Sequence, residues 1–359
     1  MSILLFIIVL AILILSHEFG HFIVAKKSGI RVDEFGFGFP PRLFKFKKGE
    51  TIYSFNLIPF GGFVKIHGEE GETLQQVQGK QEDSRSFSSK SHGIRAAVIG
   101  AGVFFNLLLA WFLLSLGLLT GLPTSIASAP ANTEIKDIKI IIVETVPNSP
   151  AAQAGLKSGD ELLGFSKIAD AQKFINENRG KEIELKCKCK RGEEVSSVRL
   201  IPRINPPEGQ GAIGIAMDEV GIVRLPFYQA IWQGLKMTHQ LTITIAVSIF
   251  YFIVAAVKGA AGFESVMGPV GIVTATGVVA KLGLAYFLSF IALLSINLAV
   301  INIIPFPALD GGRLLFLLIE KIKGSPINPR FSSIVHGIGL AILLILMLAI
   351  TYKDILKLI

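Results

Sequence analysis

The chain has 359 residues and a formal net charge of +8, and 51% of its residues are hydrophobic. With a positive mean hydropathy, this composition excludes an ordinary soluble enzyme and predicts a polytopic α-helical membrane protein with one soluble insert. The positive charge is explained by loops that face lipid head groups, so we expect the lipid bilayer, and no nucleic acid, as a partner.

The first apolar segment contains polar residues at a depth where they are rare. Residues 3–15 are wholly apolar and the run resumes at residues 22–25, which is long enough to cross a bilayer. Between them lies Ser16-His17-Glu18-Phe19-Gly20-His21. No basic residue precedes Lys26 and no small-residue cleavage pattern follows, so we expect a retained helix, not a signal peptide. Ionisable groups inside such a helix indicate a functional site.

The histidines are spaced for metal binding. On a helix, His17 and His21 project from one face a turn apart, with Glu18 beside them. Neutral imidazoles suit Zn²⁺, and a catalytic zinc needs a third protein ligand and an open position for water. Glu18 could then accept the proton of that water. The alternative, two chance histidines at a polar helix end, is disfavoured by the membrane depth.

Charge distribution predicts the topology. Further apolar stretches lie at 97–121, 241–257, 284–304 and 333–351. Basic residues gather within 26–95 and again after 304, so the positive-inside rule places both regions in the cytoplasm and both termini outside. If 241–257 also crossed the membrane, the stretch 284–304 would run outward and the basic residues after it would lie outside. The stretch 241–257 is therefore expected not to cross. We therefore predict four transmembrane helices and an interfacial or re-entrant helix at 241–257.

Two regions predict β structure. Aromatic and β-branched runs within 34–67 predict strands joined by a turn near Lys48-Gly49-Glu50, and the Gly61-Gly62 pair indicates an edge or a bulge. Residues 130–205 predict an α+β domain with strands at 138–146, 183–189 and 196–201. Its only cysteines, Cys187 and Cys189, share one face of a strand, which disfavours a mutual disulfide and leaves free thiols or intermolecular pairing.

A candidate for the third metal ligand follows the stretch 284–304. The run Asn302-Ile-Ile-Pro-Phe-Pro-Ala-Leu-Asp-Gly-Gly312 places Asp310 near the predicted cytoplasmic end of its span. His17 and His21 lie near the cytoplasmic end of the first span, so the depths agree. Prolines break the helix, and irregular backbone at membrane depth is tolerated where it lines a protein cavity. Asp310 is therefore the candidate third ligand. The alternative is an N-cap for a helix that starts at Gly311 or Gly312.

The combination of HExxH with NxxPxPxLDGG resembles the site-2 protease family of intramembrane zinc metalloproteases, in particular the bacterial regulator-of-sigma-E proteases. The resemblance implies one Zn²⁺ per chain held by His17, His21 and Asp310, with Glu18 as general base. It implies cleavage of substrate transmembrane segments within the bilayer.

Other segments extend this resemblance. Residues 95–106 resemble the second-span signature through Gly102 and Asn106, and residues 264–271 match a further signature that we describe as a gate loop. Asn297 and Asn302 match asparagines around the family's active site. We expect the three asparagines to offer hydrogen bonds to an unwound substrate, although Asn297 is equally suited to a helix–helix hydrogen bond.

The family also implies roles for the two β regions. In that family a membrane-dipping β structure lies beside the zinc, which implies the same for residues 34–67, where an exposed edge would extend a helical substrate by strand addition. The expected contacts are Ser54, Phe55, Asn56, Leu57, Gly61 and Gly62. The alternative is a sheet on the cytoplasmic surface. Residues 149–163 resemble a bacterial PDZ signature; because the following turn is altered, we favour a size filter or gate over a reader of C-termini.

The predicted organisation has four parts. Residues 1–121 form the N-terminal half of the membrane core and residues 130–205 the extracytoplasmic PDZ-like domain. Residues 222–282 form interfacial or re-entrant helices with the gate loop, and residues 283–359 the C-terminal half of the core.

The resemblance implies a bacterial inner-membrane protein with its active site near the cytoplasmic side. Single-span membrane proteins are the implied substrates, with anti-sigma factors or remnant signal peptides as candidates, after cutting by an upstream site-1-type protease. An inactive PDZ scaffold and a transporter with broken helices are the alternatives. The complete set His17, Glu18, His21 and Asp310 disfavours the scaffold, and a transporter leaves HExxH unexplained.

Overall fold

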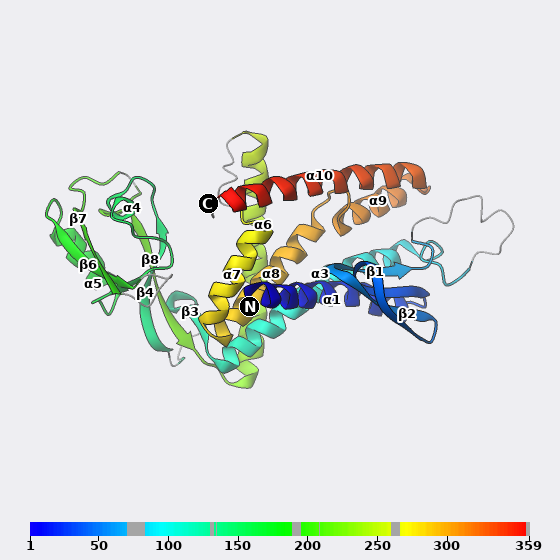
Figure 1. The fold of residues 1–359 in the computed structure, drawn as a ribbon, viewed down its shortest axis with the longest axis horizontal. Coiled ribbons are helices and arrows are strands. Elements are labelled where there is room, and N and C mark those ends of the chain that lie inside the picture. The colour runs from blue at the N-terminus through cyan, green and yellow to red at the C-terminus, as the bar shows by residue number, and fades with distance from the viewer. Residues whose placement is uncertain are drawn as a thin grey trace. The chain divides into compact units, whose positions relative to one another are not determined.

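A computed structural model describes residues 1–69, 83–129, 133, 135–188, 195–207, 209–259 and 266–356. The chain divides into two compact units, of which the first comprises residues 1–114 with 234–359 and the second residues 115–233. Long helices dominate the first unit and a β-sheet dominates the second (Figure 1).

Five described helices are long and apolar enough to cross a membrane, judged by length and composition. They are α1 (Ser2–Lys27), α3 (His92–Thr120), α6 (Phe227–Val257), α8 (Leu284–Ile303) and α10 (Pro329–Leu356). Two shorter helices, α7 (Pro269–Lys281) and α9 (Asp310–Lys323), complete the helices of the first unit. The apolar stretches expected at 97–121, 284–304 and 333–351 coincide with α3, α8 and α10.

Helix α6 is longer than the sequence predicted. The expected element covered 241–257, whereas α6 runs unbroken over 31 residues, and none of its most apolar window is buried inside the protein. The difference arises because the prediction followed uninterrupted apolar residues. The preceding Gln, Leu, Lys and Met residues are good helix formers that extend the helix without being apolar throughout. Four transmembrane helices therefore remain a prediction, beside five candidates.

The strands predicted within 34–67 are present. Strand β1 (Val32–Lys48) pairs with β2 (Thr51–Ile66) around a turn at Gly49, whose φ is 64°. Both strands bend, so that residues 32–37 lie opposite 62–66 as well as 52–55, while residues 42–48 lie opposite 51–56. Residues 52–55 therefore have strand partners on both sides. Within the described part of the chain, residues 62–66 have a partner on one side only.

A shared apolar core fixes these elements to one another. It comprises buried residues of α1, β1, β2, α3 and α9 together with two from connecting segments: Phe22, Ala25, Ile30, Val32, Ile66, Phe87, Val98, Ile99 and Leu317. Burying a large apolar side chain contributes about 1.5–3 kcal/mol. Helices α1 and α3 also approach closely at Gly20, where a Cβ atom would collide with the Ala101 carbonyl. The histidine-bearing face of α1 is thus held against α3.

The second unit contains a six-stranded sheet in the order β3-β8-β4-β5-β6-β7. Its strands are β3 (Leu122–Ser125), β4 (Ile135–Thr145), β5 (Glu161–Leu163), β6 (Ile183–Lys188), β7 (Val195–Leu200) and β8 (Ile215–Val223). Its helices are η1 (Ile126–Ser128), α4 (Pro150–Gln153) and α5 (Ile168–Glu177). Strands β4, β6 and β7 correspond to the predicted ones. The sheet also includes β3 and β8, so this unit extends beyond the expected bounds 130–205.

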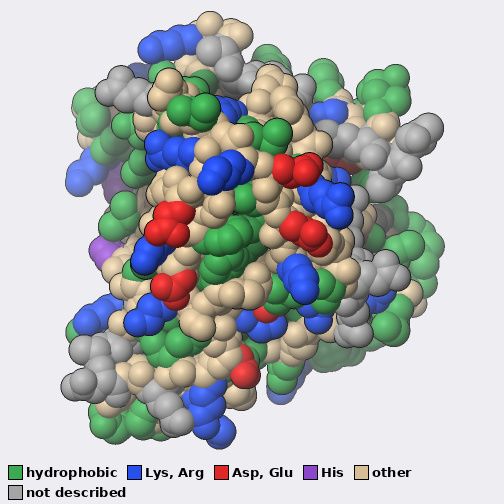
Figure 2. All heavy atoms as spheres, turned by 90° about the vertical axis from the view of Figure 1, so that its left-hand side faces the viewer, with side chains coloured by type: hydrophobic (Ala, Val, Ile, Leu, Met, Phe, Trp, Pro, Cys, Tyr) green, Lys and Arg blue, Asp and Glu red, His purple; other side chains and the backbone are tan. Residues whose placement is uncertain are grey.

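The unit has its own apolar core, which includes Ile142, Leu162, Leu185 and the buried Cys187. Cys189 lies outside the described residues. Figure 2 shows one face of the structure, on which Lys and Arg side chains are interspersed with Asp and Glu around a central apolar patch. Such mixing of charges is typical of a water-exposed surface.

Candidate metal centre

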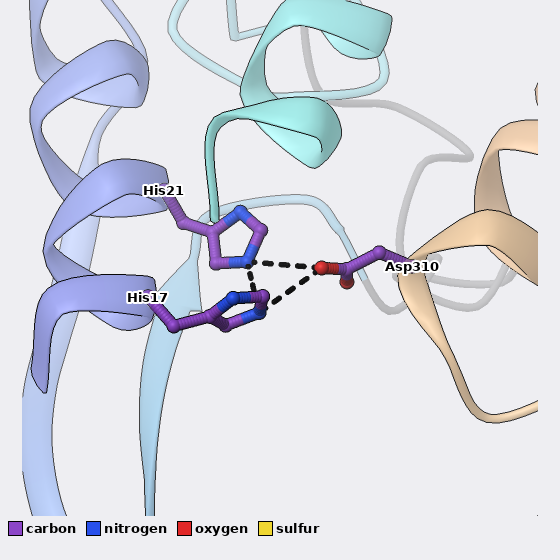
Figure 3. Close-up of side chains that lie close together, drawn as sticks. All are labelled: His17, His21 and Asp310. Carbon is purple, nitrogen blue, oxygen red and sulfur yellow. Dashed lines mark hydrogen bonds and ion pairs between the residues drawn. The ribbon is translucent and has the colours of Figure 1, made fainter. Parts of the chain in front are cut away.

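Three side chains from two distant segments converge on one point (Figure 3). His17 Nε2 lies 3.0 Å and His21 Nε2 3.4 Å from Asp310 Oδ2, and the two nitrogens are 3.2 Å apart. A tetrahedral zinc with bonds of about 2.0–2.1 Å holds its ligand atoms about 3.3–3.4 Å from one another. Both the donor set and its spacing therefore fit zinc.

Helix α1 places the two imidazoles on one face, a turn apart, with exposed fractions of 11% and 12% for their side chains. His21 Nδ1 lies 2.8 Å from the carbonyl oxygen of Val98 on α3. Because a carbonyl only accepts, this contact places the hydrogen on Nδ1 and leaves the lone pair of Nε2 directed at the cluster. His21 is thus oriented for metal binding by main chain.

Asp310 is the first residue of α9, and Leu309 is the N-cap. The Asp310 carboxylate points to the histidines (Figure 3), and Leu309 takes the N-cap position that the alternative interpretation gave to Asp310. The preceding turn is unusual because Ala308 has a φ of 77°, where residues with a Cβ atom are strained. The Ala308 N–H donates to His336 Nδ1 on α10 over 2.9 Å, which helps to hold the turn.

A cleft of about 960 Å³ opens beside the cluster. Its lining includes the three cluster residues together with Ile14, Glu18, Gly61, Gly62, Phe63, Lys65, Glu69, Asn302 and Arg313. A Cβ atom on Gly62 would lie 2.8 Å from Ile14 Cγ2 and 3.2 Å from Glu18 Cγ. The one-sided edge of β2 therefore packs directly against α1 at Glu18.

The expected β contacts separate into two groups. Gly61 and Gly62 line the cleft, on the segment that has a free edge. Ser54 and Phe55 lie between two partner segments, and Ser54 is buried. The buried Asn56 donates through Nδ2 to the Gly38 carbonyl over 2.9 Å. Phe55 and the neighbouring Leu57 are exposed, but neither is in the cleft lining.

The free edge of β2 therefore lies at residues 62–66, next to the predicted Gly61-Gly62 pair, because both strands bend and residues 34–37 pair with residues 52–55.

The three asparagines expected to contact substrate differ in their position relative to the cleft. Asn302 lines the cleft. Asn297 donates to the carbonyl of Leu293 in its own helix over 2.9 Å. Asn106 is fully buried, and its Nδ2 lies 3.3 Å from His17 Nδ1. Only Asn302 is thus placed for direct contact with a molecule in the cleft.

The sequence reasoning missed several residues of this site. Arg313, one turn after Asp310, forms an ion pair with Glu69 at 2.6 Å on the cleft wall. The carbonyl of Val98 contacts His21, and the ring of His336 accepts from the turn before Asp310, each from another helix. Spacing from Asp310 could have indicated Arg313. No sequence pattern marks the other two, because both contacts depend on how distant helices pack.

Comparison with known proteins gives consistent results over nearly the whole chain. A profile of the family described as Peptidase family M50 matches residues 5–346. Zinc metalloprotease RasP of Geobacillus kaustophilus is 31% identical over 99% of this chain and 98% of its own. Regulator of sigma-W protease RasP of Bacillus subtilis is 31% identical over 98% of each chain. Regulator of sigma-E protease RseP of Escherichia coli is 29% identical over 97% of each.

Proposed function

The chain belongs to peptidase family M50, and on that basis we propose that it is a zinc-dependent endopeptidase that cleaves membrane-spanning segments of other proteins. The observation that carries the proposal is the convergence of His17 Nε2, His21 Nε2 and Asp310 Oδ2 in a cleft that Glu18 also lines. Three ligands leave one position of a tetrahedral zinc open, as catalysis requires.

Each residue of the cluster then has a defined task. His17, His21 and Asp310 would hold the metal, which when bound would supply the Lewis acidity that polarises a carbonyl and acidifies water. Glu18 accepts a proton from the attacking water and returns it to the leaving nitrogen. Its position next to His17 in sequence and in the cleft wall supports this role.

The substrate must be extended before it can react, because a helix hides its peptide bonds in internal hydrogen bonds. We assign this task to residues 61–66, which have one free side and pack against α1 at Glu18. A substrate strand added to this edge would gain main-chain hydrogen bonds in place of its helical ones. Gly61 and Gly62 present no side chains there, and the Asn302 amide offers both a donor and an acceptor.

The decisive test of the catalytic assignment is Glu18→Gln. The variant keeps all three ligands, so it should retain one zinc per chain, while loss of the base should lower cleavage about 10²–10⁴-fold. Cleavage of a labelled single-span substrate by the purified full-length protein in liposomes measures the rate, and metal analysis measures zinc. Glu177→Gln, an exposed glutamate of the second unit, is the matched control and should change neither value. A fully active Glu18→Gln protein would refute the assignment.

For topology, we propose a multi-pass protein of the bacterial inner membrane with both termini and the second unit outside and the cleft near the cytoplasmic side. The basic residues of 26–95 support this orientation. It requires that α6 lies at the interface, although its length suffices to cross. A reporter fused after Lys258 should give an extracytoplasmic signal. A cytoplasmic signal would make α6 a fifth transmembrane helix.

The second unit is proposed as a PDZ-like gate that excludes substrates with large outer domains. Relatives named as regulators of sigma factors support single-span anti-sigma factors as a substrate class, with remnant signal peptides as another. An upstream site-1-type protease would trim such substrates first. Replacing residues 122–225 by a short linker should make untrimmed substrates cleavable, with trimmed substrates as the control. Unchanged exclusion would end the gating proposal.

A further inference from the structure

Helix α3 presents three positions, each four residues apart, to the two histidines of α1. The Val98 carbonyl lies 2.8 Å from His21 Nδ1, and the Asn106 amide lies 3.3 Å from His17 Nδ1. Between them, a Cβ atom on Gly102 would collide with both imidazole rings. Gly102 therefore lets the helix approach closely enough for the other two positions to reach the rings. These contacts show that α3 packs against both imidazole rings.

Asn106 is held firmly in this place. Its side chain is fully buried, and its backbone carbonyl accepts a hydrogen bond from Ser295 Oγ on α8 over 2.8 Å. The adjacent Phe105 carbonyl accepts one from Ser16 Oγ on α1 over 3.2 Å. Hydrogen bonds from two helices thus fix the segment that carries Asn106. Rotation of the amide about its Cβ–Cγ bond then determines whether its oxygen or its NH₂ group faces His17 Nδ1.

That rotation decides which nitrogen of His17 carries a hydrogen. An imidazole binds metal through a lone pair, and the nitrogen that faces Asp310 is Nε2. Nδ1 must then carry the hydrogen and needs an acceptor. Of the two polar groups of the Asn106 amide, the oxygen can accept this hydrogen and the NH₂ group cannot. With the NH₂ group toward Nδ1, His17 instead carries its hydrogen on Nε2 and can donate to Asp310. In the structure Nδ2 faces His17, and the buried Oδ1 has no hydrogen-bond partner among the described residues.

We propose that Asn106 is a positioning residue that holds His17 in its zinc-binding tautomer, as the Val98 carbonyl does for His21. This inference rests on the proposed zinc site and concerns metal affinity, not contact with substrate. It assigns Asn106 a different role from the substrate contact that its sequence motif implied. An asparagine suits the position because its amide can hydrogen-bond to either tautomer of His17. Zinc binding would select the orientation in which the amide oxygen faces His17 Nδ1.

The test measures zinc affinity of the full-length protein in detergent by competition with a chromophoric chelator. Asn106→Leu has a similar volume but no acceptor, and loss of a ligand's hydrogen-bond partner typically lowers metal affinity about 10–100-fold. Asn106→Asp keeps an acceptor toward Nδ1 and should bind zinc within a few-fold of the unaltered protein. Asn297→Leu makes the same change at an asparagine that bonds within its own helix, and it should leave zinc affinity unchanged.

Thermal unfolding of the zinc-free proteins checks that each variant folds, and Asn106→Ala replaces Asn106→Leu if the latter does not. Zinc binding by Asn106→Leu at the unaltered affinity would overturn the proposal, as would equal weakening in Asn106→Asp. Failure of the proposed function looks different: the unaltered protein would bind zinc, with these variants ordered as expected, yet cleave no membrane substrate.

Discussion

The two walls of the cleft are built in different ways. On the ligand wall, His17, His21 and Asp310 are side chains, and His21 and the turn before Asp310 are oriented by bonds from other helices. The other wall is the β2 segment at residues 61–66, which contributes an unpaired main-chain edge that begins with two glycines. The ligand wall therefore depends on the identity of a few atoms. The edge depends on backbone shape, so the two walls should respond to different kinds of substitution.

Removing a ligand should have the largest effect. His21→Ala leaves only two donors for the metal, so we expect zinc affinity to fall by more than the roughly hundredfold that loss of a supporting hydrogen bond can cause, and cleavage to be lost with it. Metal analysis after dialysis and a cleavage assay measure both. His239→Ala on α6 is the control and should retain one zinc per chain. Full zinc occupancy in His21→Ala would mean that the cluster does not hold the metal.

Proline scanning should separate the free edge from the covered segment. A proline within 61–66 at a position whose N–H faces the cleft removes a donor to the substrate, so cleavage should fall about tenfold or more while the protein stays folded. A proline at Ser54 or Phe55 meets partner segments on both sides and should lower the free energy of unfolding by about 1–3 kcal/mol. The opposite pattern would place the substrate contact at residues 54–57 and not at 61–66.

A smaller change at the edge is Gly62→Ala. The added Cβ atom would press on Ile14 and Glu18, so the edge must move away from α1. We expect kcat/KM to fall about tenfold, equivalent to about 1.4 kcal/mol, with zinc content unchanged. Gly93→Ala is the control, since nothing lies within 4 Å of a Cβ atom there. Equal activity of the two variants would show that contact between the edge and α1 is not needed.

Ala308→Gly should stabilise the turn before Asp310. Ala308 has a φ of 77°, and a residue with a Cβ atom in the left-handed region is strained by about 1–2 kcal/mol. Glycine relieves this strain but makes the unfolded chain more flexible, so the net gain should be about 1 kcal/mol or less. Thermal unfolding measures it, with Ala129→Gly as a control at an ordinary φ of −72°. A destabilised Ala308→Gly protein would contradict the expected strain.

The smallest effect should come from the ion pair that links the two walls. Arg313 on α9 and Glu69 after β2 are 2.6 Å apart, but the Arg313 side chain is 49% exposed. Solvent screening limits such pairs to about 0.2–1 kcal/mol. A double-mutant cycle with Arg313→Gln and Glu69→Gln, measured by chemical unfolding, should give a coupling energy in that range. A value near zero would mean that the walls are not coupled through this pair.

Local patterns along the chain predicted much of this molecule. The i, i+4 spacing of His17 and His21 puts both rings on one face of any helix, and their depth in an apolar run marks them as functional. The same reasoning selected Asp310, and the structure brings it to within 3.4 Å of both imidazole nitrogens. Long apolar stretches likewise predicted α1, α3, α8 and α10, because helix length and side-chain polarity are properties of contiguous residues.

Tertiary structure decided what those patterns could not. Sequence predicted two strands with an edge, but the bends that cover 52–55 and expose 61–66 result from pairing between residues far apart in the chain. The supporting contacts of Val98, Asn106 and His336 depend on which helix packs behind each ligand. Spacing and polarity act locally, so they were enough to predict the candidate ligands and the helices that carry His17 and His21. Only long-range packing could determine the free edge and the orientation of each ligand.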